Sequence, residues 1–448
     1  MSLKGALAVT RFGLGARTDE IDAASNDPVG WLRQQLSSAA SNAFPTESLR
    51  SSKENLTTAL EFRRSNRNER ADQNKQREFR RYVGSVSKLE LTARTTFAVS
   101  TPNPFHERLV RFWSNHFTVS MKNPQTRVSA GAFEREAIRP NILGQFADLA
   151  LNAVLHAGMI IYLDNWQSIG PNSRAGRRRR RGLNENLARE VLELHTVTPA
   201  AGYTQADVTS FAEALTGWTV GNYRIATEQL GEAVFAEPLH EPGPKTVLSK
   251  RYADMGRDQA ISIIRDLCAA PHTANNIALK LARHFVADQP PASLVEKLSN
   301  DFMQTGGDLK SLYETLIEAS EAWVYAPMKF KTPDELIVST GRLIGLRRVL
   351  VGDPSGLFES FAQTPFTAPS PEGWPDEAAA WTGPDAIMKR IEWANRLAER
   401  NATLDARTLL DRGLGDRASP EAIQAVSRAE SPSQAIVLAL MSPDFQMR

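Results

Sequence analysis

The sequence 183-LNENLAREVLELH-195 predicts an amphipathic helix, and five of its thirteen residues are charged or ionisable. On a helix, residues three and four positions apart share a face. The segment therefore has a polar and an apolar face, with Asn186, Arg189, Glu190 and Glu193 on the first and Leu187, Val191 and Leu194 on the second. The polar face is a candidate functional site, but the pattern alone does not identify the reaction.

Helical patterns of this kind recur along the chain, whereas alternating β-branched stretches are scarce. Asp27 followed by Pro28 is typical of a helix start, and Thr204 with Asp207 forms a capping box. Residues 54–97 predict one long or two shorter surface helices. The predicted fold class is mainly α: a large multi-helix domain with at most a small β-hairpin near residues 218–252.

The chain is expected to form one continuous globular unit with three parts. Residues 1–103 are an N-terminal helical segment packed on the core, and residues 104–330 are the central helical core with the candidate site. Residues 331–448 are C-terminal helices that include a Pro-, Gly- and Trp-rich loop at 352–383. Two tryptophans in that loop predict ordered, packed structure rather than a free linker.

Composition limits the classes of partner. The 53 basic and 51 acidic residues give a net charge of +2, so the whole chain has no general attraction to nucleic acid or an anionic membrane. No stretch of the sequence approaches eighteen consecutive apolar residues, so no transmembrane helix is predicted. The N-terminal residues as written show no export signal, and the single Cys268 precludes an internal disulfide. We expect a cytoplasmic protein, or a periplasmic one if it is exported with a partner or if the sequence has been trimmed.

Glu190 and Glu193 are spaced as helical bundles space the ligands of an inward-facing metal ion. His116, Asp164 and His240 could complete such a site from other segments. The sequence thus suggests a divalent metal ion as cofactor, held by His116, Glu190 and Glu193. Two observations argue against a metal site. The spacing of the carboxylates is Glu-x-x-Glu rather than Glu-x-x-His, and no HExxH, CxxC or EF-hand motif occurs.

Two other interpretations of the polar face stay open. In the first, it is a buried ion-pair network in which Arg189 stands between Glu185 and Glu193, each four positions away. In the second, it is an acid–base pair without metal: burial raises the pKa of one glutamate while Arg189 keeps the other ionised.

The run Arg177 to Arg181, with Arg174 before it, predicts binding of phosphate, sulfate or uronate groups through paired hydrogen bonds. The alternative is a solvated connector. Sequence-specific nucleic-acid binding is not favoured, because the run lacks a recognition fold and interleaved aromatic residues. The candidate binding residues are Asn184, Asn186, Arg177, Arg178, His240 and Lys245, the last two in a constrained Pro- and Gly-containing loop.

Several blocks of the chain resemble blocks of the bacterial family called "domain of unknown function 1800", and they follow one another in the same order as in that family. The matching blocks are 11-RFGLGA-16, 112-FWSNHF-117, 162-YLDN-165, 184-NENLARE-190, 193-ELHT-196, 202-GYTQADV-208, 215-LTGW-218, 240-HEPGPK-245 and 442-SPDFQ-446. The resemblance implies a helical bacterial protein, often accompanied by a sulfatase-like or phosphatase-like partner encoded nearby. Many relatives carry an export signal that this chain lacks, and 197-VTPAA-201 replaces a glycine-rich turn.

Two classes of function follow from these patterns. The first is a metal-assisted or carboxylate-based hydrolase of a polar envelope or saccharide substrate, with Glu190 and Glu193 as base or ligands, Asp164 and His116 in support, and Arg189 as the orienting residue. The second is a non-catalytic binding or partner protein, in which the polar face is structural and the arginines dock an anionic ligand or a protein.

Overall fold

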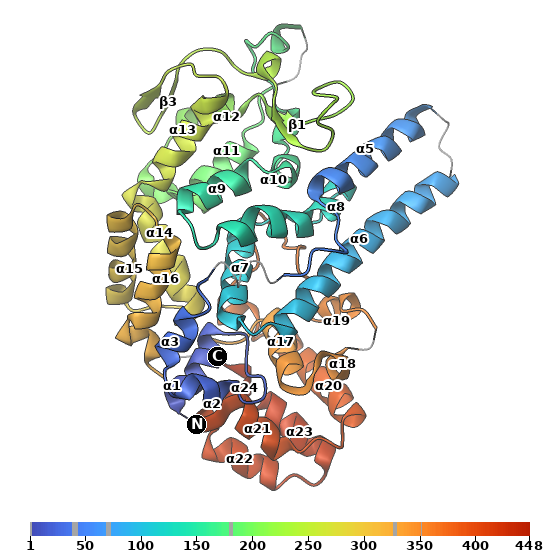
Figure 1. Ribbon diagram of the computed structural model, residues 1–448, viewed down its shortest axis with the longest axis vertical. Helices are drawn as coiled ribbons and strands as arrows, with labels where there is room; N and C mark the ends of the chain where they lie inside the picture. Colours follow the sequence, from blue (N-terminus) through green and yellow to red (C-terminus); the bar gives the residue numbers. More distant parts are fainter. Residues whose placement is uncertain (1, 38–43, 69–72, 179–181, 326–328, 351) are drawn as a thin grey trace.

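The computed structural model describes residues 2–37, 44–68, 73–178, 182–325, 329–350 and 352–448. The chain is 64% helix and 4% strand, which confirms the predicted mainly α class. The helices stack into an elongated body from which one helical pair projects (Figure 1). No helix among the described residues is long and apolar enough to cross a membrane.

The first part of the chain supplies short helices and the projecting pair. Asp27 accepts a hydrogen bond from the amide of Gly30, and Pro28 is the first helical residue, as the sequence predicts. The charged stretch 54–97 forms two antiparallel helices that extend beyond the body (Figure 1). The elements are α1 (Leu3–Leu7), η1 (Ala8–Phe12), α2 (Glu20–Ser25), α3 (Pro28–Arg33), α5 (Ser52–Asn68) and α6 (Gln73–Ser100).

The central part carries most of the predicted site residues. Its first half consists of α7 (Pro104–His116), α8 (Pro124–Phe133), η2 (Glu134–Ile138), η3 (Arg139–Asn141), α9 (Phe146–Val154), α10 (Ala157–Tyr162), η4 (Asn165–Gln167) and η5 (Gly176–Arg178). Then come α11 (Asn186–Glu190), η6 (Val191–His195), η7 (Pro199–Ala201) and α12 (Gln205–Leu215). Thr204 and Asp207 form the predicted capping box at the start of α12.

The predicted β region contains two small antiparallel sheets instead of one hairpin. Strand β1 (Trp218–Val220) pairs with β2 (Ala233–Phe235), with Thr219 opposite Val234. After η8 (Glu237–Leu239), β3 (Lys245–Val247) pairs with β4 (Lys250–Tyr252). Four helices and a turn follow: α13 (Arg257–Cys268), α14 (Pro271–Phe285), α15 (Ala292–Thr305), α16 (Leu309–Glu318) and η9 (Ser320–Trp323).

The C-terminal helices form the opposite end of the body (Figure 1). They are α17 (Pro333–Ile344), α18 (Leu346–Val349), α19 (Ser355–Ser360), η10 (Ala378–Ala380), α20 (Pro384–Arg400), α21 (Ala406–Leu414), η11 (Gly415–Arg417), α22 (Pro420–Ser427), α23 (Pro432–Met441) and α24 (Pro443–Gln446). The loop between α19 and α20 is pinned to the core, because the amide of Trp374 donates to Asn115 Oδ1 at 2.8 Å.

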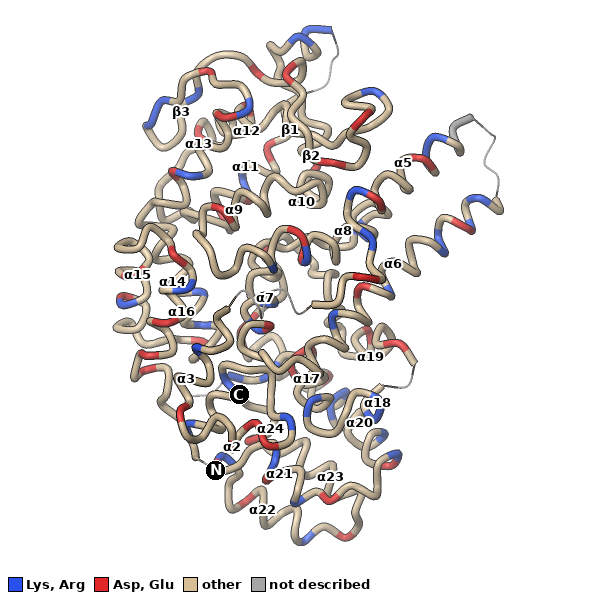
Figure 2. The backbone as a smooth tube through the Cα atoms, in the orientation of Figure 1, with Lys and Arg blue, Asp and Glu red and all other residues tan. Residues whose placement is uncertain are grey.

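Three hydrophobic clusters hold the described elements together, and two of them are large. The larger joins α1 to η9 and has Trp113 of α7 fully buried within it. The smaller joins α6 and the C-terminal helices, with Trp393 of α20 in its interior. Basic and acidic positions are interspersed along the whole backbone (Figure 2), in keeping with the small net charge.

Candidate functional site

Segment 183–195, predicted to be one amphipathic helix, is helical only from Asn186 onward, and the kind of helix changes within it. After five residues of α-helix it continues as the π-helical turn η6. Leu187 and Val191 are buried, whereas Glu190 and Glu193 are only partly buried. Leu194, the third residue of the predicted apolar face, is also only partly buried. Single π-helical turns are frequent at functional sites.

Glu190 lies in a cluster of opposite and like charges. Burial raises its pKa, and the charge of Glu193 raises it further, while Arg189 and Lys122 act in the other direction. Lys122 Nζ is 5.0 Å from the ring centroid of Tyr162, and burial together with Glu190 raises the pKa of that phenol to about 12. The Tyr162 hydroxyl is buried and has no hydrogen-bond partner among the described residues.

Arg189 turns away from this pair of carboxylates. Its Nη2 is 3.2 Å from Glu185 Oε2 and donates to Gln205 Oε1 at 3.0 Å. Within the described parts of the chain it forms no ion pair with Glu193, so only half of the anticipated Glu185–Arg189–Glu193 network is present. Hydrogen bonds from Thr209 and Gln205, with Arg189 nearby, lower the pKa of Glu185.

Three predicted polar residues have local partners that shape the surrounding turns. Asp164 has a positive φ of 60° at the start of η4, and its Oδ1 accepts a hydrogen bond from Gln167 at 2.9 Å. Asn184 Oδ1 accepts from the amide of Asn186 at 2.9 Å. These contacts account for the local backbone, and a role in chemistry remains a prediction.

His116 is buried beside His195 and Lys280. Its Nε2 is 3.2 Å from the carbonyl oxygen of His195, and its Nδ1 is 3.4 Å from Lys280 Nζ. Burial and the charge of Lys280 hold the pKa of His116 well below its usual value, so the ring stays neutral. Both ring nitrogens are thus occupied away from Glu190 and Glu193.

The predicted metal ligands are not brought together. Across the residues that the structure describes, no three His, Cys, Asp or Glu side chains are placed so that they could share one metal ion. This covers His116 with Glu190 and Glu193, since each of the three lies in a described segment.

His240 and Lys245 hold their own loop in place. His240 Nδ1 is 2.8 Å from the carbonyl oxygen of Thr216. Lys245 Nζ donates to the carbonyl oxygens of Pro242 and Gly243, each at 3.0 Å. Both side chains are buried, so the loop conformation depends on them.

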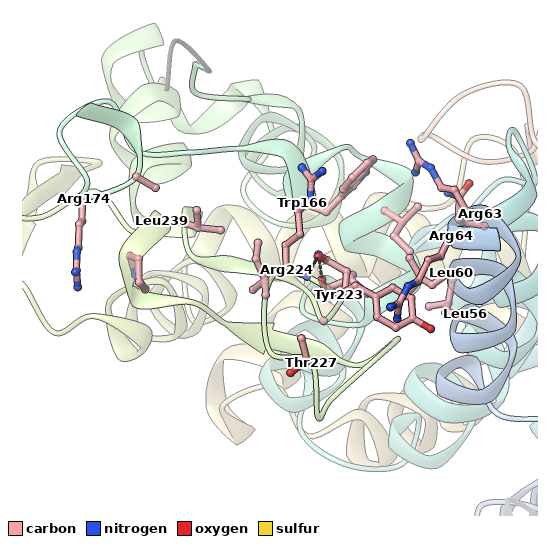
Figure 3. A pocket seen from close by; sticks show the side chains of 18 of the residues that line it. Leu56, Leu60, Arg63, Arg64, Trp166, Arg174, Tyr223, Arg224, Thr227 and Leu239 are labelled. Carbon is pink, nitrogen blue, oxygen red and sulfur yellow. Dashed lines mark hydrogen bonds between the residues drawn. The ribbon is translucent and has the colours of Figure 1, made fainter. Parts of the chain in front are cut away.

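A cleft of about 1270 Å³ opens between α5, the segment around η5 and the loop that joins β1 to β2. We call it the arginine cleft, because five arginines line it: Arg63, Arg64, Arg174, Arg178 and Arg224. Figure 3 shows Arg63 and Arg64 on one side, Tyr223 and Arg224 between, and Arg174 at the far end. Of the predicted run, Arg178 lines the cleft, Arg177 is an exposed neighbour, and 179–181 lie outside the described residues.

The cleft is strongly cationic. None of the described residues that line it is acidic. All five guanidinium groups are on exposed residues, and none forms an ion pair with a described carboxylate. The Arg64 guanidinium lies 4.3 Å from the ring centroid of Tyr223, and Trp166 contributes a second partly exposed aromatic ring. An anion entering here would meet several unneutralised cations at once.

Sequence reasoning missed half of the cleft. The charged pattern around Arg63 and Arg64 predicts only a surface helix, and no sequence motif includes Arg224. The loop is anchored to α5, because Thr57 Oγ1 donates to the carbonyl oxygen of Leu230 at 3.0 Å. A Cβ atom on Gly231, whose φ is 76°, would lie 2.6 Å from the carbonyl oxygen of Lys53. Glycine therefore permits the close approach that completes the cleft.

Comparison with known proteins gives one family. The family model described as "Protein of unknown function (DUF1800)" matches residues 7–447. No curated protein and no solved structure matches the chain.

Proposed function

This chain belongs to the DUF1800 family, whose description assigns no activity, and we propose from the arginine cleft that it binds an extended anionic saccharide bearing carboxylate or sulfate groups. The observation that carries the proposal is the set of five arginines around one cleft, none of which pairs with a carboxylate of the described residues. A planar guanidinium group donates two parallel hydrogen bonds to a carboxylate or a sulfate. Five guanidinium groups around one cleft therefore favour a ligand that carries several negative charges.

The size and composition of the cleft favour a saccharide. Its volume of about 1270 Å³ exceeds the roughly 300–1000 Å³ of usual small-molecule pockets. Trp166 and Tyr223 offer apolar ring faces among the cations, which suits the apolar faces of sugar rings. Gln125 adds a neutral hydrogen-bonding group that can bind hydroxyls.

Replacing Arg63 and Arg64 together with Ala is expected to weaken binding of an oligogalacturonate about tenfold, because charge-assisted hydrogen bonds are lost. Isothermal titration at low and moderate salt measures this, and the wild-type affinity should fall as salt rises. A neutral malto-oligosaccharide of the same length should bind much more weakly than the uronate.

The matched control replaces two exposed arginines outside the cleft, Arg347 and Arg412, with Ala. This pair removes the same net charge, so its affinity should stay close to that of the wild type. Equal losses in both double variants would mean that general charge attraction, and not the cleft, binds the ligand.

A second candidate function is carboxylate-based hydrolysis of such a saccharide. It is favoured by the raised pKa of Glu190 beside Glu193, since a general acid needs a carboxyl that stays protonated. Ile161 lines the cleft, and the charge of Glu190 raises the pKa of Tyr162, the next residue along the chain.

Replacing Glu190 with Gln is expected to raise stability at pH 7 by a few tenths to about 1 kcal/mol, after allowance for solvent screening. The folded pKa of Glu190 is raised, so its stabilising contribution is present at low pH and is lost as pH rises through that value. The gain in melting temperature should therefore disappear near pH 4, and any hydrolysis should be lost at both pH values.

Glu185→Gln is the control in the same segment. The pKa of Glu185 is lowered in the folded protein, so its replacement should reduce stability at pH 7. If both variants lowered the melting temperature, Glu190 would belong to a structural ion-pair network and the hydrolase candidate would fail.

A further inference from the structure

A second cavity, of about 460 Å³, lies apart from the arginine cleft, between α7, α14, the start of α17 and the loop 363–377. We call it the lysine chamber. Its volume falls within the roughly 300–1000 Å³ of ordinary small-molecule sites. Apolar side chains from three segments line it, among them Leu14, Phe112, Val119 and Phe366.

Most charges that line the lysine chamber are already neutralised. Arg108 pairs with Glu335, Arg111 pairs with Asp334, and Arg283 Nη1 is 3.4 Å from Glu377. Lys280 differs, because it forms no ion pair with any described carboxylate. Its ammonium nitrogen is 3.1 Å from the carbonyl oxygen of Leu194 and 3.4 Å from the Nδ1 of His116.

Lys280 is held where its charge is poorly compensated. Burial lowers its pKa to about 8, and the exposed Glu372, which also lines the chamber, acts in the other direction. The other ionisable groups around the amine are Arg283 on its own helix, His116 on α7 and His195 on η6. Burial and Lys280 lower the pKa of His195 to about 3, so neither histidine supplies a charge.

The indole of Trp374, which also lines the chamber, provides a further donor. Its Nε1 is buried and has no partner among the described residues. Asn115 holds the backbone of Trp374 through two hydrogen bonds of 2.9 and 2.8 Å, and the next residue along α7, His116, contacts Lys280. Buried donors without an acceptor are rare, and each costs free energy unless a ligand or water satisfies it.

We propose that the lysine chamber binds a small monocarboxylate with a compact apolar body, whose carboxylate accepts hydrogen bonds from the Lys280 ammonium and the Trp374 indole. The apolar walls then cover the body of the ligand. One unpaired cation matches one negative charge, so a ligand with two carboxylates is disfavoured by Glu372 and by the paired acids around it.

Phenylacetate is the probe, and phenylacetamide is its neutral analogue of the same shape. Titration calorimetry on the full chain should show that the wild type binds phenylacetate at least about tenfold more tightly than the amide. Lys280→Met keeps the length of the side chain and removes its charge, and should abolish that preference.

Glu372→Gln is the second variant, and it should strengthen phenylacetate binding, whereas Lys280→Met should weaken it. Removing this exposed carboxylate should tighten phenylacetate binding about two- to fivefold, because one repulsive charge disappears. The amide should bind the variant and the wild type equally. Equal affinity of the wild type for phenylacetate and phenylacetamide, or no binding of either, would overturn the proposal, as would weaker phenylacetate binding by Glu372→Gln.

Discussion

Replacing Glu335 with Gln is expected to lower the free energy of unfolding by about 3–5 kcal/mol, among the largest effects of any single change in this protein. The carboxylate lies between two buried guanidinium groups: Arg108 Nη1 is 2.5 Å from Oε1 and Arg448 Nε is 2.7 Å from the same atom. The backbone amide of Thr332 donates to Oε2 at 2.9 Å. Without the negative charge, the two buried cations face each other, and the nearest remaining counter-charge is Asp376, whose Oδ1 is 3.5 Å from Arg448 Nη2.

The same substitution should change how stability depends on pH. Burial alone would raise the pKa of Glu335, but Arg448 and Arg108 outweigh it and hold the pKa far below its usual value. A lowered folded pKa contributes stability that is present at neutral pH and is lost as pH falls below about 4.5. The wild type should therefore lose more stability between pH 7 and pH 3 than the variant does.

Chemical denaturation at pH 7 and pH 3 measures both effects. Glu399→Gln is the control, because that glutamate is exposed on α20 and its loss should change stability by less than about 0.5 kcal/mol. A loss below about 1 kcal/mol for Glu335→Gln would show that the buried guanidinium groups do not depend on this carboxylate.

Replacing Trp113 with Ala is the second large change, with an expected loss of about 3–5 kcal/mol. The indole is fully buried, and its Nε1 donates to the Tyr313 hydroxyl at 2.5 Å. Its ring centroid is 5.0 Å from that of Phe112 and 5.6 Å from that of Phe146. Alanine would leave a cavity where α7, α9 and α16 meet, and would strand the Tyr313 hydroxyl.

Trp113→Phe separates the two contributions. Phenylalanine keeps much of the aromatic packing but removes the indole N–H, so the expected loss is about 1–3 kcal/mol, the cost of a buried hydroxyl without its partner. Denaturant titration of both variants checks this order. Equal losses would show that packing against the neighbouring rings contributes little beyond the hydrogen bond.

Features that depend on local sequence were predictable. The helix starts at Asp27–Pro28 and Thr204–Asp207 are present because each cap bonds to an amide only three residues away. His116 follows Phe105, Leu109 and Phe112 at spacings of four, three and four, a pattern typical of a buried helical face, and it is buried. Its partners were not predictable, since Lys280 and His195 come from distant segments whose approach only the packed core determines.

The arginine cleft shows the same limit. A charged helix such as α5 is usually solvated, and nothing in its pattern indicates that a loop far along the chain covers one side of it. That closeness depends on Gly231 and on the Thr57 hydroxyl, which bring Tyr223 and Arg224 opposite Arg63 and Arg64. The π-helical turn at Val191–His195 was also unforeseen, because one extra residue per turn leaves no simple periodic trace.

The most direct test of the proposed function is a crystal structure of the protein with a bound oligogalacturonate. We predict that the ligand lies in the arginine cleft, with uronate carboxylates about 2.7–2.9 Å from guanidinium nitrogens of Arg63, Arg64 or Arg224. A ligand bound at another surface, with the five arginines of the cleft free of contact, would contradict the account.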